Sequence, residues 1–208
     1  MLLNSQVWPK DRWKVTVKTM IASHHEAIWR SKAATNSKLA YLNVQASGLS
    51  GRPHPVLTGV MTTQEVVRSR VHIRMLTGDY PCQQYVGKDR DQDTSCRLCL
   101  AVFPGCPPKS EDMEHLLTRC RVTAEIRQRI IPDILTALSQ HFPGNSLLEH
   151  TSHGHLTQFL LDPTSLSLPQ SIRISPVHPA LPLVLNLCRH FCFAVHKERT
   201  RQLKLRQK

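Results

Sequence analysis

Apolar side chains recur at helical spacing in four long segments of the chain. In residues 10–32 the apolar positions are Trp13, Val17, Met20, Ile21 and Ile28. They are spaced three, four or seven residues apart, which places them on one face of a helix. Similar patterns occupy residues 62–76, 122–142 and 180–208. The pattern therefore predicts a mainly α protein with several helices.

Local signals indicate where two of these helices begin, end or bend. A capping box begins at Thr62 or Thr63, with Glu65 close behind. Gly78 is placed to end the same helix. Pro132 is expected to kink the helix at 122–142 or to restart it, because proline has no amide hydrogen to donate.

Stretches rich in Pro, Gly and Ser separate the helices, so we expect loose loops between them. No internal repeat is present. We expect five successive regions: an N-terminal basic amphipathic helix (1–45), a loop plus an Arg-rich helix (46–95), a zinc-binding knuckle with its following helix (96–142), an irregular linker with one short helix near 156–161 (143–179), and a C-terminal helix with a basic tail (180–208).

Composition adds a preference for polyanions. The chain has 208 residues, 40% of them hydrophobic, which is enough for one domain with a sizeable core. Its formal charge of +12 favours nucleic acid as a partner, before an anionic membrane. The candidate phosphate contacts, for which a merely solvated face is the alternative interpretation, are Arg68, Arg70, Arg74, Lys197, Arg199, Arg201, Lys204 and Arg206.

The seven cysteines argue for a reduced environment. Their number is odd, and the first residues form no apolar leader, which is unlike a secreted disulfide framework. No apolar run approaches the roughly 20 residues of a membrane span. We expect a soluble intracellular protein, nuclear or cytoplasmic, without a membrane partner.

The segment SCRLCLAVFPGCPPKSEDMEHLLTRC, residues 95–120, carries the candidate chemistry. Cys96 and Cys99 form a C-x2-C pair, and His115 and Cys120 follow on a predicted helix that Ser110 can cap. Together they make a Cys3His set, which is typical of a closed structural zinc site without a position for a catalytic water.

Two alternatives to this ligand set stay open. The four cysteines can be scattered core residues, and Cys106 is a rival ligand that we interpret as a spare thiol. Cys188 and Cys192, beside phenylalanines on the last helix, are interpreted as core or interface residues and not as ligands.

Several motifs resemble the region downstream of the polymerase in non-LTR (LINE-like) retrotransposon reverse transcriptases. They are HIRMLTGDYP (72–81), CRLC (96–99), EDMEHLLTRC (111–120), LLDP (160–163) and FAVHKERTRQLK (193–204). The resemblance covers roughly residues 10–205. It implies a zinc-binding module that helps to hold RNA or target DNA, with Cys96, Cys99, His115 and Cys120 as ligands.

The catalytic part of such an enzyme is missing. The chain has no F/Y-x-DD motif and no adjacent aspartates for a two-metal reaction. We therefore expect a nucleic-acid-binding module that is not an enzyme. The alternative is an interaction or structural piece, or a remnant, in which the apolar helix at 180–195 is exposed and binds a polymerase or a second copy.

Overall fold

The described chain is built from helices, as the computed structural model shows for residues 9–36, 39–43, 54–58, 62–83, 93–103, 105, 107, 109–141 and 151–205. Within these ranges the only extended pairing is an isolated antiparallel bridge between Ser95 and Ser110. The prediction of a mainly α protein is therefore confirmed.

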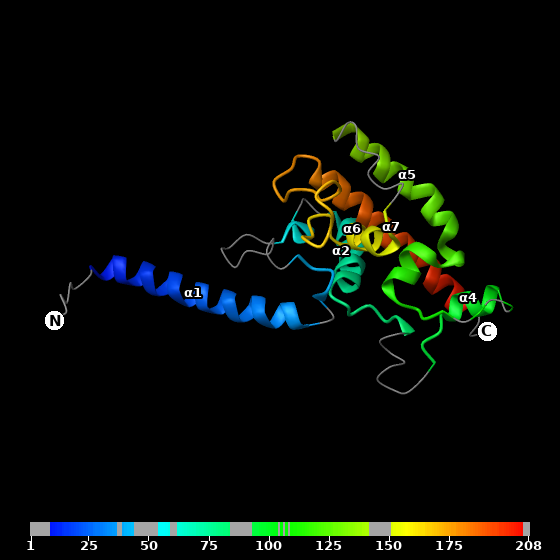
Figure 1. The fold of residues 1–208 in the computed structure, drawn as a ribbon, viewed down its shortest axis with the longest axis horizontal. Coiled ribbons are helices and arrows are strands. Elements are labelled where there is room, and N and C mark those ends of the chain that lie inside the picture. The colour runs from blue at the N-terminus through cyan, green and yellow to red at the C-terminus, as the bar shows by residue number, and fades with distance from the viewer. Residues whose placement is uncertain are drawn as a thin grey trace.

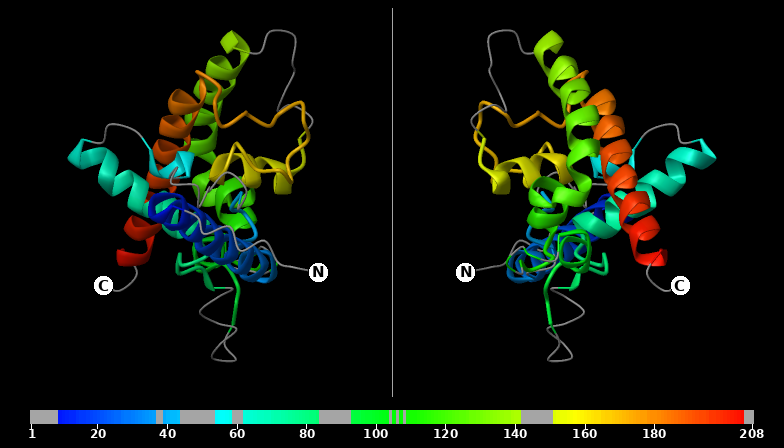
Figure 2. Two further views of the ribbon diagram at one scale, coloured as in Figure 1. Left: turned by 90° about the vertical axis from the view of Figure 1, so that its left-hand side faces the viewer. Right: turned by 90° about the vertical axis from the view of Figure 1, so that its right-hand side faces the viewer.

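Helix α7 (Leu181–Lys204) forms the centre of the fold. It packs against α2 (Thr63–Leu76) and α5 (Ala124–His141), and the short α6 (His153–Leu161) also contacts it (Figures 1 and 2). The apolar face of α7 is buried along its length at Val184, Leu185, Cys188, Phe191, Cys192 and Val195. This face explains the helical period of the sequence, because positions three and four apart lie on one side of a helix.

The expectation of an exposed apolar helix at 180–195 is wrong. The face that would be free for a partner is covered by side chains of the same chain, among them Met75 of α2 and Ile134 of α5. Cys188 and Cys192 lie in this core, as predicted, and burial raises the pKa of Cys188 to about 12. A thiol with such a pKa stays protonated and unreactive near neutral pH.

Helix α1 (Lys10–Thr35) confirms the first predicted helix, but its large apolar side chains are not buried, and among its described side chains only Ala33 near its end is. In Figure 1 it extends away from the other helices. Trp13 is 57% exposed and Met20 is 66% exposed. The helical period of residues 10–32 therefore predicted the element correctly without predicting burial.

The ends of α2 follow the sequence signals. The hydroxyl of Thr62 accepts a hydrogen bond from the Glu65 amide, and the Glu65 carboxylate accepts one from the Thr62 amide at 2.7 Å. Gly78 follows the helix with a φ of 67°, which glycine adopts without a steric penalty. Helix α5 continues through Pro132 and does not restart there.

The linker becomes irregular after α6, and Asp162 connects it to two earlier segments. Its carboxylate accepts hydrogen bonds from the Asn43 amide at 2.7 Å and the Thr164 hydroxyl at 2.6 Å, and it lies 3.3 Å from His54 Nε2. Burial disfavours ionisation, but these partners outweigh it and lower the pKa of Asp162. The expected division into five regions has no sharp counterpart here, because residues from four of them share one core.

Candidate metal centre and basic groove

The four residues that the sequence singled out as ligands converge on one point. One ligand atom from each of Cys96, Cys99, His115 and Cys120 lies within 4.8 Å of all the others. Cys99 Sγ is 3.3 Å from His115 Nε2 and 3.5 Å from Cys120 Sγ. Three of the residues are buried and Cys99 is half-buried. These four residues, which we call the metal cluster, could hold one metal ion.

The first ligand pair is positioned by a short helix and a backbone clamp. Cys96 directly precedes α4 (Arg97–Val102), and Cys99 lies in its first turn. The Cys96 amide donates to the Lys109 carbonyl at 2.7 Å, and the Glu111 amide donates to the Thr94 carbonyl at 2.9 Å. These bonds hold the two ends of the intervening loop together, so the C-x2-C pair faces the segment that carries the second pair.

The second ligand pair depends on a π-helical turn, η3 (His115–Arg119). In an α-helix, residues five apart point in directions that differ by about 140°. Here the Cys120 amide donates to the His115 carbonyl at 2.6 Å, which is the i→i+5 bond of a π turn. The wider turn brings both side chains to the same side. The H-x4-C spacing and the π turn therefore fit each other.

The helix that carries His115 begins differently from the sequence prediction. Ser110 was expected to cap it, but Ser110 forms the bridge to Ser95 instead. The carboxylate of Asp112 accepts the His115 amide at 2.6 Å and so serves as the cap. The correction has a physical reason, because the clamp at Lys109 and Glu111 holds Ser110 in extended backbone.

The electrostatics of the cluster favour a cation at its centre. A hydrogen bond to Cys120, followed by burial, raises the pKa of Cys96, and burial raises the pKa of Cys99. Backbone amides act in the opposite direction: that of Cys99 bonds to the Cys96 sulfur, and that of Arg121 bonds to the Cys99 sulfur. Hydrogen bonds from backbone N–H groups to sulfur stabilise thiolates. A bound metal ion would take the place of the thiol protons, which the neighbouring sulfurs hold in its absence.

Arg127 supplies positive charge beside the sulfurs. Its guanidinium donates to the Thr123 hydroxyl at 2.7 Å, within electrostatic reach of Cys99 and Cys120. Burial lowers the pKa of Arg127, and the two cysteines oppose that shift. A site with three thiolates around a divalent ion carries one net negative charge, which this arginine balances. His115 Nδ1, the ring nitrogen that does not face Cys99, is buried without a hydrogen-bond partner among the described residues.

Arg199 is a predicted phosphate contact, but its side chain is buried and joins α7 to the segment that carries the metal cluster. It donates to the Glu111 carboxylate from Nη2 at 2.6 Å and from Nε at 3.0 Å, and to the Pro81 carbonyl at 2.8 Å. Glu111 is fully buried and Arg199 is 7% exposed. The guanidinium is thus unavailable to a phosphate, and the prediction for this residue is corrected.

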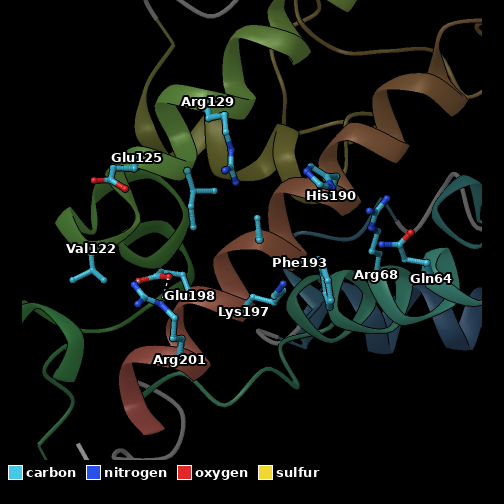
Figure 3. A pocket seen from close by; sticks show the side chains of 12 residues that line it. Gln64, Arg68, Val122, Glu125, Arg129, His190, Phe193, Lys197, Glu198 and Arg201 are labelled. Atoms are coloured by element: carbon cyan, nitrogen blue, oxygen red, sulfur yellow. Dashed lines mark hydrogen bonds and ion pairs between the residues drawn. The ribbon is translucent and has the colours of Figure 1, made fainter. Parts of the chain in front are cut away.

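Three other predicted contacts gather around one hollow. Arg68 of α2 and Lys197 and Arg201 of α7 line a cavity of about 820 Å³ between α2, α5 and α7 (Figure 3). Arg129 of α5 and His190 of α7 line it too, and neither is among the predicted contacts. No sequence signal could have found these two, because only the packing of α5 beside α7 brings them to Arg68.

A second hollow of about 930 Å³ adjoins the first. The two share Gln64, Phe193, Lys197 and Arg201, and Lys204 lines the second. We call the two hollows together the basic groove. Arg70 and Arg74 are exposed on α2 outside it. Arg206 and Cys106 lie outside the described residues.

Cations outnumber carboxylates in the basic groove, where Glu125 and Glu198 also line the first hollow. Arg201 is paired, since its Nε and Nη2 donate to Glu198 at 2.9 and 2.7 Å. Among the described residues, Arg68, Arg129 and Lys197 form no ion pair. Burial, followed by the charges of Arg68 and Arg129, lowers the pKa of His190. The charge of Asp133 acts in the opposite direction.

Comparison with known proteins does not place the chain in a family. No model of a protein family matches it, and neither a curated protein nor a solved structure matches it. The resemblance to retrotransposon reverse transcriptases therefore rests on the motifs quoted above. Among the described residues, no helix combines the length and apolar character needed to cross a membrane.

Proposed function

We propose that the chain is a zinc-stabilised module that binds nucleic acid and has no catalytic activity of its own. The observation that carries this proposal is the basic groove. Arg68, Arg129 and Lys197 come from three helices and line one hollow, and among the described residues none of them forms an ion pair with a carboxylate. Like charges held together in this way are stabilised by a polyanion, and phosphates supply the matching charge.

Zinc is the metal that the cluster fits best. Three thiolates and one imidazole form a tetrahedral donor set that zinc commonly takes in structural sites. All four positions are filled by protein atoms, so a bound ion would have none for a substrate or a reactive water. The role of such an ion is to stabilise the fold. The Cys3His set and the missing polymerase motif thus both support a protein without catalytic activity of its own.

The metal cluster supports the basic groove through α7. Glu111 lies between the two ligand pairs in sequence and holds Arg199, which is two residues from both Lys197 and Arg201. Folding of the cluster therefore fixes the part of α7 that presents these side chains. We infer that the resemblance to the tail of a retrotransposon reverse transcriptase reflects the origin of this combination.

Salt dependence tests the binding. A labelled single-stranded oligonucleotide of mixed sequence should bind with an affinity that falls steeply with salt. Three phosphate contacts predict a slope of about −2 when the logarithm of the association constant is plotted against that of the salt concentration. The measurement is fluorescence anisotropy at increasing potassium chloride. Replacing two of the contacts, Arg129→Gln with Lys197→Gln, should bring the slope closer to zero, to about −0.7.

The control removes the same charge from another exposed surface. The double variant Lys14→Gln with Lys18→Gln alters α1 and should keep the steeper slope. A flat response of the unaltered protein would contradict binding through phosphates. Equal effects of the two double variants would show that overall charge, and not the groove, attracts the nucleic acid.

A further inference from the structure

The basic groove contains an aromatic side chain among its cations. Phe193 lines both hollows and is half-buried. It lies one helical turn before Lys197 and two turns before Arg201, so the three occupy one face of α7. Figure 3 shows Phe193 between Lys197 and the α2 residues Arg68 and Gln64.

An aromatic ring in this place would add nothing to the binding of a bare anion. A free phosphate, or the backbone of a closed duplex, offers charge to the arginines but nothing to the ring. An unpaired base offers a flat π-face, and stacking on aromatic side chains together with phosphate contacts is the general way in which proteins hold single strands.

The shape of the groove suits a strand that continues past one nucleotide. The two hollows, of about 820 and 930 Å³, share Gln64, Phe193, Lys197 and Arg201 and so adjoin along the same face of α7. Cations stand in both parts, with Arg68 and Arg129 in the first and Lys204 in the second. The first turn of α2, at Thr63 and Gln64, adds the positive end of a helix dipole.

We propose that the basic groove holds a single strand of nucleic acid, with phosphates at Arg68, Arg129 and Lys197 and an unpaired base stacked on Phe193. The proposal rests on the proposed function and specifies its substrate class. It assigns affinity to the cations and the preference for unpaired bases to the ring, so the two contributions can be measured separately.

The test compares three probes of equal length by fluorescence anisotropy at one salt concentration. They are a single-stranded oligonucleotide, an abasic strand with the same phosphates, and the corresponding duplex. The unaltered protein should bind the base-bearing single strand at least about fivefold more tightly than the abasic strand, which is the lower end of what one stacked base contributes. The duplex should also bind more weakly than the single strand.

Variants then locate the preference. Phe193→Leu should remove most of the difference between the base-bearing and abasic strands and leave abasic binding unchanged. Phe103→Leu is the matched control, since it removes the same ring outside the groove, where Phe103 lies under Arg121. Arg129→Gln should weaken all strands alike, whereas Arg70→Gln, on the same helix as Arg68 but outside the groove, should weaken none.

The outcomes separate this proposal from the proposed function. If the unaltered protein binds the base-bearing and abasic strands equally, the base on Phe193 is excluded, while salt-dependent binding stands; this comparison needs no variant to fold. Tighter binding of the duplex also overturns the proposal. If no probe binds at all, the proposed function fails and the substrate class fails with it.

Discussion

His72 is a buried residue that folding keeps uncharged. It lies in α2 with no exposed surface, and its Nε2 donates to the Leu160 carbonyl at 3.1 Å. Burial lowers its pKa from 6.5 to about 4. The unfolded chain therefore takes up a proton on this residue at a higher pH than the native protein does.

The sign of the pH dependence follows from these two pKa values. Between them the unfolded state binds more protons, so the stabilisation is complete above about pH 6.5 and is lost as the pH falls toward about 4. We expect the free energy of unfolding to decrease there by up to about 1.4 kcal/mol per pH unit because of His72. His72→Gln, which keeps an amide donor but cannot titrate, should remove this contribution. Urea unfolding at several pH values measures how steeply the free energy of unfolding changes with pH in each of the two proteins.

The comparison of the two proteins isolates His72 from the metal cluster. Metal binding at the cluster also depends on pH, but both proteins carry the same four ligands, so that effect cancels in the difference. Identical slopes for His72→Gln and the unaltered chain would show that His72 is not kept neutral by the fold.

At the scale of elements, the pair of Glu111 and Arg199 connects α7 to the loop before η3. Both groups are withdrawn from water, and the pair spans 88 residues of sequence. Removing one partner leaves the other charge buried and unpaired, which typically costs about 3–5 kcal/mol. We therefore expect Glu111→Gln to lower the free energy of unfolding by several kcal/mol, measured by chemical denaturation.

An exposed pair on one helix provides the comparison. Glu26 and Arg30 form an i,i+4 ion pair on α1, where water screens the charges. Glu26→Gln should cost only about 0.3–0.5 kcal/mol. If the two substitutions cost the same, the connection through Glu111 contributes little to stability, and the support that the metal cluster gives to α7 is absent.

The sequence predicted helices and helix ends better than it predicted how helices pair. The capping box at Thr62 and the left-handed Gly78 are local features, so the sequence alone sufficed. The choice of Asp112 over Ser110 as a cap was not accessible, because hydrogen bonds at Thr94 and Lys109 determine it. The C-x2-C and H-x4-C spacings indicated the ligand set, but nothing in them indicated the π turn.

At the scale of the molecule, the metal cluster is part of the single core. Leu98, Leu116 and Leu117 stand beside the ligands and belong to the same buried set as the α7 side chains. Loss of the ion would therefore weaken the whole fold and not a separate appendage. The effect should be visible in the melting of the entire protein.

Metal content and thermal stability test this dependence together. We expect one zinc ion per chain by mass spectrometry of the purified reduced protein, and none in the variant Cys99→Ser with His115→Ala. Loss of the ion should lower the free energy of unfolding by several kcal/mol. Because each kcal/mol corresponds to about 2–4 °C at this size, a chelator should lower the melting temperature of the unaltered protein by at least about 10 °C. The variant should not respond to the chelator.

An exposed histidine serves as the control for metal binding. His25→Ala on α1 should keep the ion and the full response to the chelator. Zinc that persists after both Cys99 and His115 are replaced would place the metal elsewhere, and an absence of zinc from all three proteins would mean that the cluster is a packing feature.

The arrangement of whole helices was the least accessible to sequence. Arg68 and Lys197 were recognised as basic residues of separate segments, but their meeting around a hollow with Arg129 depends on contacts between elements far apart in the chain. For the same reason the apolar period of 180–195 does not tell an exposed helix from a buried one. A period shows that a helix has an apolar face, and it does not identify what covers that face.

The central position of α7 also determines when the protein can fold during synthesis. α2, α5 and α6 are all made before it, yet each packs against it. Until residues 181–204 have left the ribosome, α2 and α5 lack the helix against which they chiefly pack. The nascent chain therefore passes through an interval in which apolar faces of these helices are open to chaperones and to aggregation, and a chain that ends before α7 lacks the centre of its core.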